Sequence, residues 1–398
     1  MSIRVLHLLH YLNRGGIENW LLDLAHVVDR AELSMDVCCR GPTTGELVPE
    51  FEAAGARVHH VPMTWNHFDF GRRLGRLLRD ERYDVLHVHA GSFAGYPCRV
   101  AHRNGVAAVT TYHSTHFPFE VTGLVSSLNW LRAMYTRRSF RTACRESDVV
   151  VSCSRSTEQA IMRLSGVAPD ARFRIVPNGT SKSPGRNPQS RTATRQALGL
   201  LPNAPVAIHV GGMKDPKNHA GLLRIADRIR AVLPSFRLLI VGDGLLRPKI
   251  ERQIALLGLE GVATLLGSRG DVERLLDAAD VMLFPSLWEG LPIAVIEAQM
   301  RGLPVVGSDI GPLQEATLPG QSSLLFPVER EREMADAAVS LLTDEPRRRA
   351  MGDAAVAFAG DRFSIAANSA RYLEIYREAA RRAGRVAMTA AAPVVSTS

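Results

Sequence analysis

Two glutamates stand in an otherwise apolar stretch of the sequence, FPSLWEGLPIAVIEAQMRGLPVV at residues 284–306. They are Glu289 and Glu297. In a helix, eight residues span about 12 Å along the axis, which is too far for two carboxylates to act as one acid–base pair. Carboxylates bind paired hydroxyl groups such as those of a ribose. We therefore expect Glu297 to bind a ribose and Glu289 to bind hydroxyls of a second sugar.

A predicted helix start separates the two glutamates. Pro292 fits the first turn of a helix, where its missing N–H costs nothing, so Glu289 falls in the preceding loop and Glu297 in the helix. The N–H groups of Ile293 and Ala294 would then be free to hold a phosphate between the two sugars. This order predicts a ligand with the shape sugar–diphosphate–ribose. A buried capping glutamate beside an exposed one is the alternative explanation.

Glycines and lysines elsewhere fit the same ligand. In LNRGGIENW, Gly15 and Gly16 precede an amphipathic segment, so their backbone can approach an anion at a helix start. The chain has four lysines, and Lys214 and Lys217 share one loop, where Lys217 would meet a diphosphate. For the two glycines the alternative is a tight turn, and for the two lysines it is an exposed, solvated loop. A complete GxGxxG pattern is missing, which disfavours a dinucleotide cofactor.

Histidines gather near two predicted strand ends. His87 and His89 lie in DVLHVHA, and His113 and His116 lie in TYHSTHF. Ligands of open α/β sheets bind beyond the carboxyl ends of the strands, so we expect His113 to face the ligand and His87 and His89 to pack on the sheet. The sequence has neither DxD nor cysteines or carboxylates at ligand spacing beside these histidines, and we predict no metal site.

Composition limits the class of protein. The 398 residues are 46% hydrophobic and 22% charged, which is ordinary for a globular protein. No apolar run approaches the roughly 20 residues of a membrane span, and the N-terminus lacks a cleavable signal pattern, so we expect a cytoplasmic protein. The five cysteines lack zinc-finger spacing and fit buried thiols. The net charge of +8 favours anionic partners, but the basic residues are dispersed, which disfavours nucleic acid.

Short β-type runs alternate with amphipathic segments along the chain. Strands are expected at 4–10, 35–41, 57–62, 84–90, 107–113, 148–154 and 173–179, and again at 205–212, 236–244, 262–268, 281–286, 303–309 and 322–327. Such apolar runs suit parallel strands that are buried on both faces. The alternation predicts an α/β fold of two tandem doubly wound, Rossmann-like domains that face each other across a cleft.

Changes in composition suggest the domain boundaries. We expect a first domain at 1–180, a linker rich in Gly, Pro, Ser and Thr at 181–204, and a second domain with both glutamates at 205–363. A helix at 364–383 ends the fold. Residues 384–398 are small and of low complexity, which predicts a disordered tail.

Over nearly its whole length the chain resembles the retaining GT-B glycosyltransferases of family 4, of the exopolysaccharide type. The likeness rests on NRGGIENW, VPNG, VGG…KDPKNH, LLIVGDGLL, GSRGDVERLLDAADVMLFPSLWEGLPIAVIEAQMRGLPVV and FSIAANSARYLEIYRE. Its most specific element is the E-x7-E spacing of Glu289 and Glu297. The resemblance implies transfer of a sugar from a nucleotide-diphosphate sugar to a hydroxyl acceptor with retention at the anomeric carbon. It also implies that the last helix packs back on the first, acceptor-side domain.

The resemblance implies roles for single residues as well. Glu297 would bind the donor ribose, Glu289 and His113 the transferred sugar, Gly16 the distal phosphate and Lys217 the diphosphate. The predicted catalytic residues are His113, Glu289 and Lys217, and the predicted donor-binding residues are Gly15, Gly16, Gly212, Lys214, Arg269, Gly290, Leu291, Ile293, Ala294 and Glu297. Neither a cofactor nor a metal ion is expected to be required.

One departure from the family pattern concerns the diphosphate. The family has an arginine where this chain has Gly212, so we expect Lys214, Arg269 or Arg14 to supply that charge. Two other functions stay open: a catalytically impaired nucleotide-sugar-binding protein and a GT-B nucleotide-sugar epimerase.

The acceptor would be a glycan or a lipid-linked saccharide, and one segment bears on this choice. The segment 119–145 places apolar residues at helical spacing among arginines: Leu124, Leu128, Leu131 and Tyr135 with Arg132, Arg137, Arg138, Arg141 and Arg145. A basic amphipathic helix can lie on anionic lipid, which would suit a lipid-linked acceptor at the inner membrane face. Packing of this helix on the first domain is the alternative.

Overall fold

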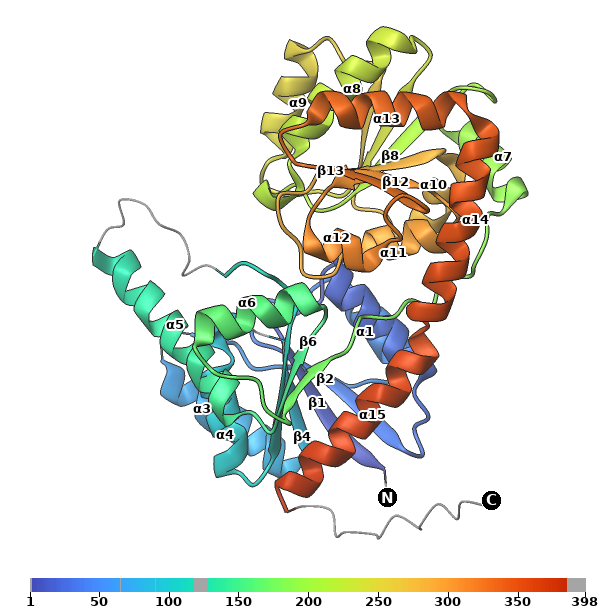
Figure 1. Ribbon diagram of the computed structural model, residues 1–398. Helices are drawn as coiled ribbons and strands as arrows, with labels where there is room; N and C mark the ends of the chain where they lie inside the picture. The colour runs from blue at the N-terminus through green and yellow to red at the C-terminus, as the bar shows by residue number, and fades with distance from the viewer. Residues whose placement is uncertain (1, 65, 90, 118–126, 385–398) are drawn as a thin grey trace.

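Two α/β units, each built on a parallel sheet, make up the molecule and lie one above the other in Figure 1. The computed structural model describes residues 2–64, 66–89, 91–117 and 127–384. Two predictions fall partly outside these residues: the disordered tail beyond residue 384, and the basic helix at 119–126, with Leu124. The two-domain Rossmann-like fold expected from the sequence is confirmed.

The first unit contains a seven-stranded sheet in the order β3-β2-β1-β4-β5-β6-β7. Its strands are β1 (Ile3–Leu9), β2 (Leu33–Cys39), β3 (Val58–His60), β4 (Val85–Val88), β5 (Ala107–Tyr112), β6 (Val149–Ser152) and β7 (Phe173–Ile175). Its helices are α1 (Gly16–Val27), α2 (Val48–Ala53), α3 (His67–Asp80), the 3-10 turn η1 (Gly91–Phe93), α4 (Gly95–Arg103), α5 (Ser127–Glu146) and α6 (Arg155–Ser165). Each strand overlaps an apolar run predicted to be one.

The second unit contains a six-stranded sheet in the order β10-β9-β8-β11-β12-β13. Its strands are β8 (Val206–Val210), β9 (Arg237–Val241), β10 (Ala263–Gly267), β11 (Val281–Phe284), β12 (Val305–Ser308) and β13 (Ser323–Phe326). Its helices are α7 (Pro188–Ala197), the 3-10 turn η3 (Asp215–Lys217), α8 (His219–Val232), α9 (Arg247–Leu256), α10 (Val272–Ala278), α11 (Ile293–Met300), α12 (Gly311–Ala316), α13 (Glu331–Thr343) and α14 (Glu345–Arg362).

The predicted linker 181–204 is not irregular throughout, because it contains helix α7. The Asn187 side chain accepts a hydrogen bond from the Ser190 N–H, and Pro188 follows it, which is a favourable helix start. Within α7, Arg195 is buried and its guanidinium lies 2.9 Å from the Asp280 carboxylate. The second half of this segment therefore packs as part of the second unit.

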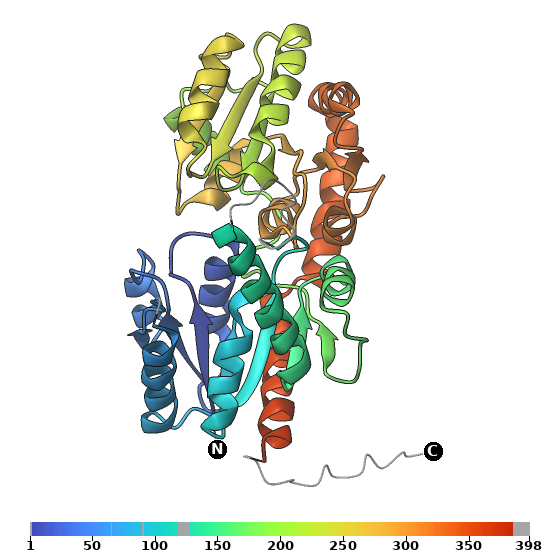
Figure 2. The same cartoon turned by 90° about the vertical axis from the view of Figure 1, so that its left-hand side faces the viewer.

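The last helix, α15 (Ile365–Arg382), leaves the second unit and packs on the first. It runs down the side of the lower unit in Figures 1 and 2. Tyr372 and Tyr376 are fully buried there, in the same apolar core as Trp20. The Trp20 indole N–H also donates to the Asn368 side chain at 2.9 Å. The carboxyl-terminal helix thus completes the core of the amino-terminal unit.

The backbone passes between the two units at two places, and these places touch. The Thr180 N–H donates to the Phe363 carbonyl at 2.9 Å, and the Ile365 N–H donates to the Thr180 carbonyl at 3.3 Å.

Among the described helices, none is both long and apolar enough to cross a bilayer. All five cysteines are buried free thiols.

Strand order locates the region where a ligand is expected. The order reverses at β1 and β4 in the first sheet and at β8 and β11 in the second. Ligands of doubly wound sheets bind beyond the carboxyl ends of the strands at such a reversal. The loops that follow these four strands, together with the residues after β5, carry most of the predicted site residues.

Candidate functional site

Two loops of the second unit are tied together at the reversal of its sheet. The loop after β8 contains η3, and the loop after β11 leads to α11. The Leu287 N–H donates to the Pro216 carbonyl at 2.7 Å, and the Asn218 side-chain amide donates to the Pro285 carbonyl at 3.0 Å. These bonds fix the position of Lys217, which lies between Pro216 and Asn218, next to the second loop.

Lys217 and Glu289 meet as a result. Lys217 Nζ donates to Glu289 Oε1 at 2.6 Å, and the same ammonium lies 4.7 Å from the centre of the Phe284 ring. The two side chains keep 20% and 12% of their surface exposed, so a ligand can reach them. The pair therefore combines a cation for phosphate with a carboxylate for hydroxyl groups.

The start of α11 faces the start of α1. Val295 and Ile296 donate their N–H groups to the Pro292 carbonyl, whereas the N–H groups of Ile293 and Ala294 lie at the helix end, where the helix itself supplies no acceptor. A Cβ placed on Gly16 would lie 3.5 Å from Ile293 Cδ1. Two positive helix ends thus converge between the units, which suits an anion.

The loop with Glu289 packs directly on residues that follow β5 and β6. The Thr115 hydroxyl donates to the Glu289 carbonyl at 2.7 Å, and the Ser154 hydroxyl donates to the Gly290 carbonyl at 2.8 Å. A Cβ on Gly290 would overlap the His113 carbonyl, so only glycine allows this approach. His113 and Glu289, predicted from distant parts of the sequence, are brought to the same side of the interface.

A further contact between the units was not predicted from the sequence. Glu315 of α12 accepts hydrogen bonds from the N–H groups of Arg155 at 2.7 Å and Ser156 at 2.9 Å, and from the Ser156 hydroxyl at 2.8 Å. A carboxylate at the positive end of α6 is electrostatically favourable. This contact stabilises the arrangement in which the two loops meet.

His113 is held in a buried, neutral state. Its Nε2 lies 3.0 Å from His89 Nδ1, and its ring lies 5.8 Å from the Trp20 ring. Burial lowers the pKa of His113 to about 3. An imidazole in this state has one N–H and one lone pair but carries no charge at neutral pH.

Glu297 lies within α11, beyond the loop that carries Glu289. Its pKa is raised to about 7, chiefly by burial and also by the nearby Asp23 and Glu273, against the opposing effect of Lys182. The carboxyl group thus changes charge near neutral pH. The placement of one glutamate in the loop and the other in the helix agrees with the sequence analysis.

The cations expected to replace the missing arginine differ in their environments. Arg269 pairs with Asp271 at 2.7 Å and Arg14 pairs with Glu50 at 2.8 Å. Within the described residues, Lys214 has no ion-pair partner, and its Cε lies 3.8 Å from a Cβ placed on Gly212. Of the three expected cations, Lys214 is thus the one that lies beside Gly212.

Glu18 is not among the residues predicted for the site, and the structure places it close to Lys214. The pKa of Glu18 is raised to about 7 by burial, against the opposing effects of a backbone hydrogen bond and of Lys214 in the other unit. Its carboxylate lies over Gly15, where a Cβ would collide with it. The pattern GGIE would have identified the residue, but only the assembled interface shows its environment.

Leu291 does not present its side chain to the predicted site. Only 8% of the residue is exposed, and it packs in the apolar core that includes Val295 and Phe284. Any contact with a ligand would be made through its backbone.

Three other histidine rings lie close enough to raise the question of a metal ion. The ring nitrogens of His7, His87 and His89 lie within 4.8 Å of one another. Both nitrogens of His87 are already engaged, at 2.8 Å with the Tyr376 hydroxyl and at 2.6 Å with the Thr111 hydroxyl. His87 is thus engaged in hydrogen bonds within the core, and the absence of a metal site stays a prediction from the sequence.

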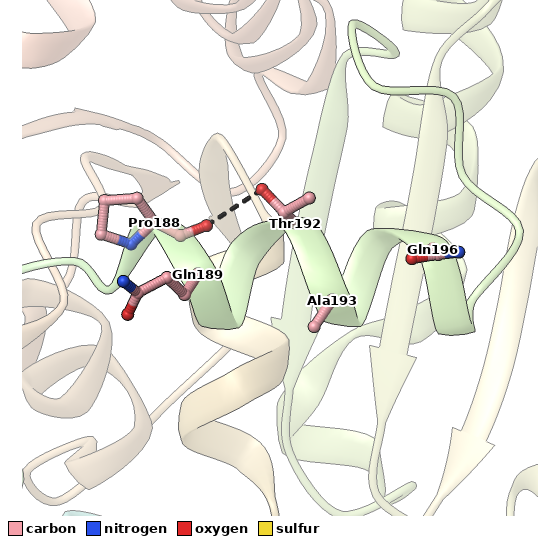
Figure 3. Close-up of a pocket in the computed structure, with 5 residues that line it drawn as sticks. All are labelled: Pro188, Gln189, Thr192, Ala193 and Gln196. Carbon is pink, nitrogen blue, oxygen red and sulfur yellow. Dashed lines mark hydrogen bonds between the residues drawn. The ribbon is translucent and has the colours of Figure 1, made fainter.

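A hollow of about 470 Å³ elsewhere is lined by one side of α7, with Pro188, Gln189, Thr192, Ala193 and Gln196 (Figure 3). The hydrogen bond drawn there, from the Thr192 hydroxyl to the Pro188 carbonyl, lies within the helix. Because a single helix supplies every lining residue, the hollow does not compete with the interface as a ligand site.

Comparisons with known proteins identify the family of the chain. Residues 14–183 match the family model described as Glycosyltransferase Family 4, and residues 190–357 match Glycosyl transferases group 1. The chain is 32% identical over 328 residues to the UDP-Gal:alpha-D-GlcNAc-diphosphoundecaprenol alpha-1,3-galactosyltransferase of Escherichia coli. The matched region covers 78% of this chain and 80% of that protein. It is 26% identical over 310 residues to the putative glycosyltransferase EpsF of Bacillus subtilis, with 77% and 79% covered.

Solved structures show the same architecture. Anabaena Alr3699/HepE in complex with UDP-glucose superposes with a TM-score of 0.78 at 19% identity, over 97% of this chain and 100% of that one. WaaG, a glycosyltransferase involved in lipopolysaccharide biosynthesis, superposes with a TM-score of 0.72 at 18% identity, over 94% and 99%. These similarities identify the fold as GT-B.

Proposed function

Because the chain belongs to the family 4 (group 1) glycosyltransferases, we propose that it transfers a sugar from a nucleotide-diphosphate sugar to a hydroxyl acceptor with retention at the anomeric carbon. The observation that carries this proposal is the Lys217–Glu289 pair, 2.6 Å apart beside the converging starts of α1 and α11. A cation and two helix ends suit a diphosphate, and the carboxylate suits the hydroxyls of the sugar attached to it.

Each site residue has a role in the proposed complex. Glu297 binds the ribose hydroxyls, and the N–H groups of Ile293 and Ala294 bind the diphosphate. Lys217 exchanges Glu289 for a phosphate oxygen when the donor enters, which leaves Glu289 free for the sugar. The positions of the two glutamates on a loop and a helix support this division.

Stabilisation of the leaving group drives the proposed reaction. The bond from the anomeric carbon to the diphosphate oxygen breaks, and negative charge accumulates on the diphosphate next to Lys217 and the two helix ends. The acceptor hydroxyl forms its new bond on the face that the diphosphate leaves, and a phosphate oxygen takes its proton. Neither a covalent protein nucleophile nor a metal ion takes part.

The names of similar proteins suggest the substrates. One relative uses UDP-Gal and a diphosphoundecaprenol acceptor, and a protein of the same fold binds UDP-glucose. We therefore favour a UDP-sugar as donor and a lipid-linked saccharide as acceptor.

Helix α5 supports contact with an anionic membrane, where such an acceptor would lie. Near its start, Trp130, Leu131 and Met134 expose 60%, 51% and 51% of their surface. Farther along the helix is a hollow of about 530 Å³ lined by Arg99, Met134, Arg137, Arg138, Arg141, Thr142, Arg145 and Glu146. Exposed apolar side chains followed by arginines suit insertion beside lipid phosphates. The opposite side of α5 packs on the first unit through Phe140 and Cys144.

One experiment tests the proposed reaction and separates it from the alternatives. A panel of UDP- and GDP-sugars is incubated with the protein and an undecaprenyl-diphosphate saccharide in the presence of EDTA, and the product linkage is determined by NMR. We expect an axial donor linkage to be retained in the product. An inverted product contradicts retention, and activity that EDTA abolishes contradicts metal independence. Binding without transfer indicates an impaired enzyme, and a changed sugar without acceptor indicates an epimerase.

A further inference from the structure

Three histidines form a hydrogen-bonded chain that leads from the core of the first unit to the candidate site. They are His7 of β1, His89 just after β4 and His113 just after β5. His7 Nδ1 lies 3.1 Å from His89 Nε2, and His89 Nδ1 lies 3.0 Å from His113 Nε2. The two terminal nitrogens, His7 Nε2 and His113 Nδ1, are buried and have no hydrogen-bond partner among the described residues.

The rings in this chain are neutral. Burial lowers the pKa of His7 and of His113 to about 3, and it lowers the pKa of His89 well below the ordinary value. A neutral imidazole carries one N–H and one lone pair. Each of the two contacts therefore contains a single proton, and the position of one proton determines the position of the others.

Only two arrangements satisfy both contacts. In the inward arrangement, His113 Nε2 donates to His89, His89 Nε2 donates to His7, and the N–H of His7 Nε2 points into the core. In the outward arrangement, His7 Nδ1 donates to His89, His89 Nδ1 donates to His113, and His113 carries its proton on Nδ1. The first places a lone pair on the outer nitrogen, and the second places an N–H there.

Each arrangement leaves one buried N–H without an acceptor among the described residues, at His7 or at His113, so an acceptor supplied by a ligand at the outer end decides between them. An N–H without an acceptor in a protein core is rarely tolerated, whereas an acceptor without a donor is less unfavourable. The inward arrangement would keep such an N–H at His7 permanently. The outward arrangement leaves an N–H only at His113, where a bound sugar can supply an oxygen.

We propose that His7 and His89 are positioning residues that hold neutral His113 with its proton on Nδ1, so that His113 donates a hydrogen bond to a hydroxyl oxygen of the transferred sugar. The contact with sugar rests on the proposed function. The choice of the outward arrangement rests on it too, because the sugar supplies the acceptor for the N–H at His113, whereas the chain of histidine contacts does not.

His87 provides a matched control within the same cluster. Its ring lies 4.0 Å from the His89 ring and is fully buried. Its nitrogens contact Tyr376 and Thr111, so it is not a link in the chain. A purely structural role would make substitutions of His87 and His89 equivalent.

The test is the protonation pattern of His113 in protein with ¹⁵N-labelled histidine, read from long-range ¹H–¹⁵N correlations. The His113 signals are assigned by their loss in His113→Gln. We expect the proton on Nδ1 in the wild type and in His87→Gln. His89→Leu should move it to Nε2, the form preferred in water, and His89→Asn, whose amide can donate in place of Nδ1, should restore it. A wild-type proton on Nε2 overturns the proposal without any variant.

The kinetic readout separates the proton position from the sugar contact. We expect His89→Leu to lower kcat for transfer about tenfold, the effect of one hydrogen bond, while the Kd of UDP stays unchanged. An unchanged proton position in His89→Leu, or an equal shift in His87→Gln, contradicts the proposal. If no donor is ever used but His113 carries its proton on Nδ1, the proposed function fails and the positioning role stands.

Discussion

Lys217 and Glu289 neutralise each other in the unliganded site, with Nζ 2.6 Å from Oε1. The two residues come from different loops of one unit, and backbone hydrogen bonds between these loops fix their approach. In the proposed complex a nucleotide sugar has to separate the pair, because its phosphate binds the ammonium and its hydroxyls bind the carboxylate. We therefore expect the ion pair to oppose the binding of an incomplete ligand that supplies phosphate alone.

This relationship predicts opposite effects of one substitution on binding and on transfer. Glu289→Gln should tighten UDP, which lacks the sugar, by a few-fold, because Lys217 no longer has to leave an ion pair worth up to about 1 kcal/mol. The same variant should lose most of its transfer activity. Calorimetry with UDP and steady-state kinetics measure the two effects.

Lys217→Met should instead weaken UDP and lower kcat/KM by roughly 10²–10³, as expected for loss of one group that stabilises a developing anion. Lys249→Met on α9 and Glu260→Gln are controls, because both residues are exposed in the same unit. Weaker UDP binding by Glu289→Gln would contradict the idea that the pair is a barrier.

The raised pKa of Glu297 predicts pH-dependent donor binding. With a pKa of about 7, the carboxyl group is mostly protonated at pH 6 and mostly ionised at pH 8. Only the ionised form accepts hydrogen bonds from both ribose hydroxyls, so affinity for a nucleotide sugar should rise about tenfold over this range. Glu297→Gln should remove the dependence. The intact nucleotide sugar is used because the terminal phosphate of UDP itself titrates near pH 6.

Glu18 titrates in the same range but with the opposite effect on an anionic ligand. Its pKa is also about 7, so its negative charge beside Lys214 appears as pH rises and disfavours diphosphate. In Glu18→Gln the rise in affinity should therefore become steeper. A flat profile in that variant would exclude Glu297 as the titrating ligand group.

Gly212→Arg should restore a charge that the chain lacks relative to its family. A Cβ at this position would lie 3.6 Å from the Asp243 carbonyl, which is an ordinary contact, so the backbone leaves room for a side chain to begin there. We expect UDP affinity to rise about tenfold through a charge-assisted hydrogen bond, and we expect no rise for the uncharged control Gly212→Gln. Lys214→Ala should weaken UDP in the wild type but less in Gly212→Arg. Equal loss in both backgrounds would show that Lys214 does not substitute for the arginine.

Helix α5 predicts association with anionic vesicles. Trp130→Ser combined with Met134→Ser should reduce flotation with vesicles that contain phosphatidylglycerol, and Arg137→Gln with Arg138→Gln should reduce it mainly at low salt. Leu256→Ser is the control, since Leu256 is 86% exposed on α9 of the other unit. Flotation that none of the α5 variants changes would place the contact elsewhere.

The strands were readable from the sequence because parallel strands buried on both faces require continuous apolar runs, as in Val149–Ser152. Helix α7 was not, because its composition resembles that of a loop. Its start nevertheless had a signal, Asn187 followed by Pro188, which together form a favourable helix start.

Long-range pairing explains what the sequence did not show in the site. His7 lies opposite His87 in the register of β1 and β4, although the two residues are 80 positions apart in the sequence. The residues around His7 in the sequence do not indicate that other histidines lie beside it. The ion pair of Lys217 depends likewise on a backbone bond between Pro216 and Leu287. Residue types indicated the chemistry, but the contacts that tune it depend on tertiary structure.

The paired crossings at Thr180 and Phe363–Ile365 have a consequence for synthesis and engineering. During translation the first unit emerges from the ribosome before helix α15 has been made. Until then, the part of its sheet on which Tyr372 and Tyr376 pack stays uncovered. A chimera in which only the second unit is exchanged must therefore keep residues 365–382 from the same protein as the first unit.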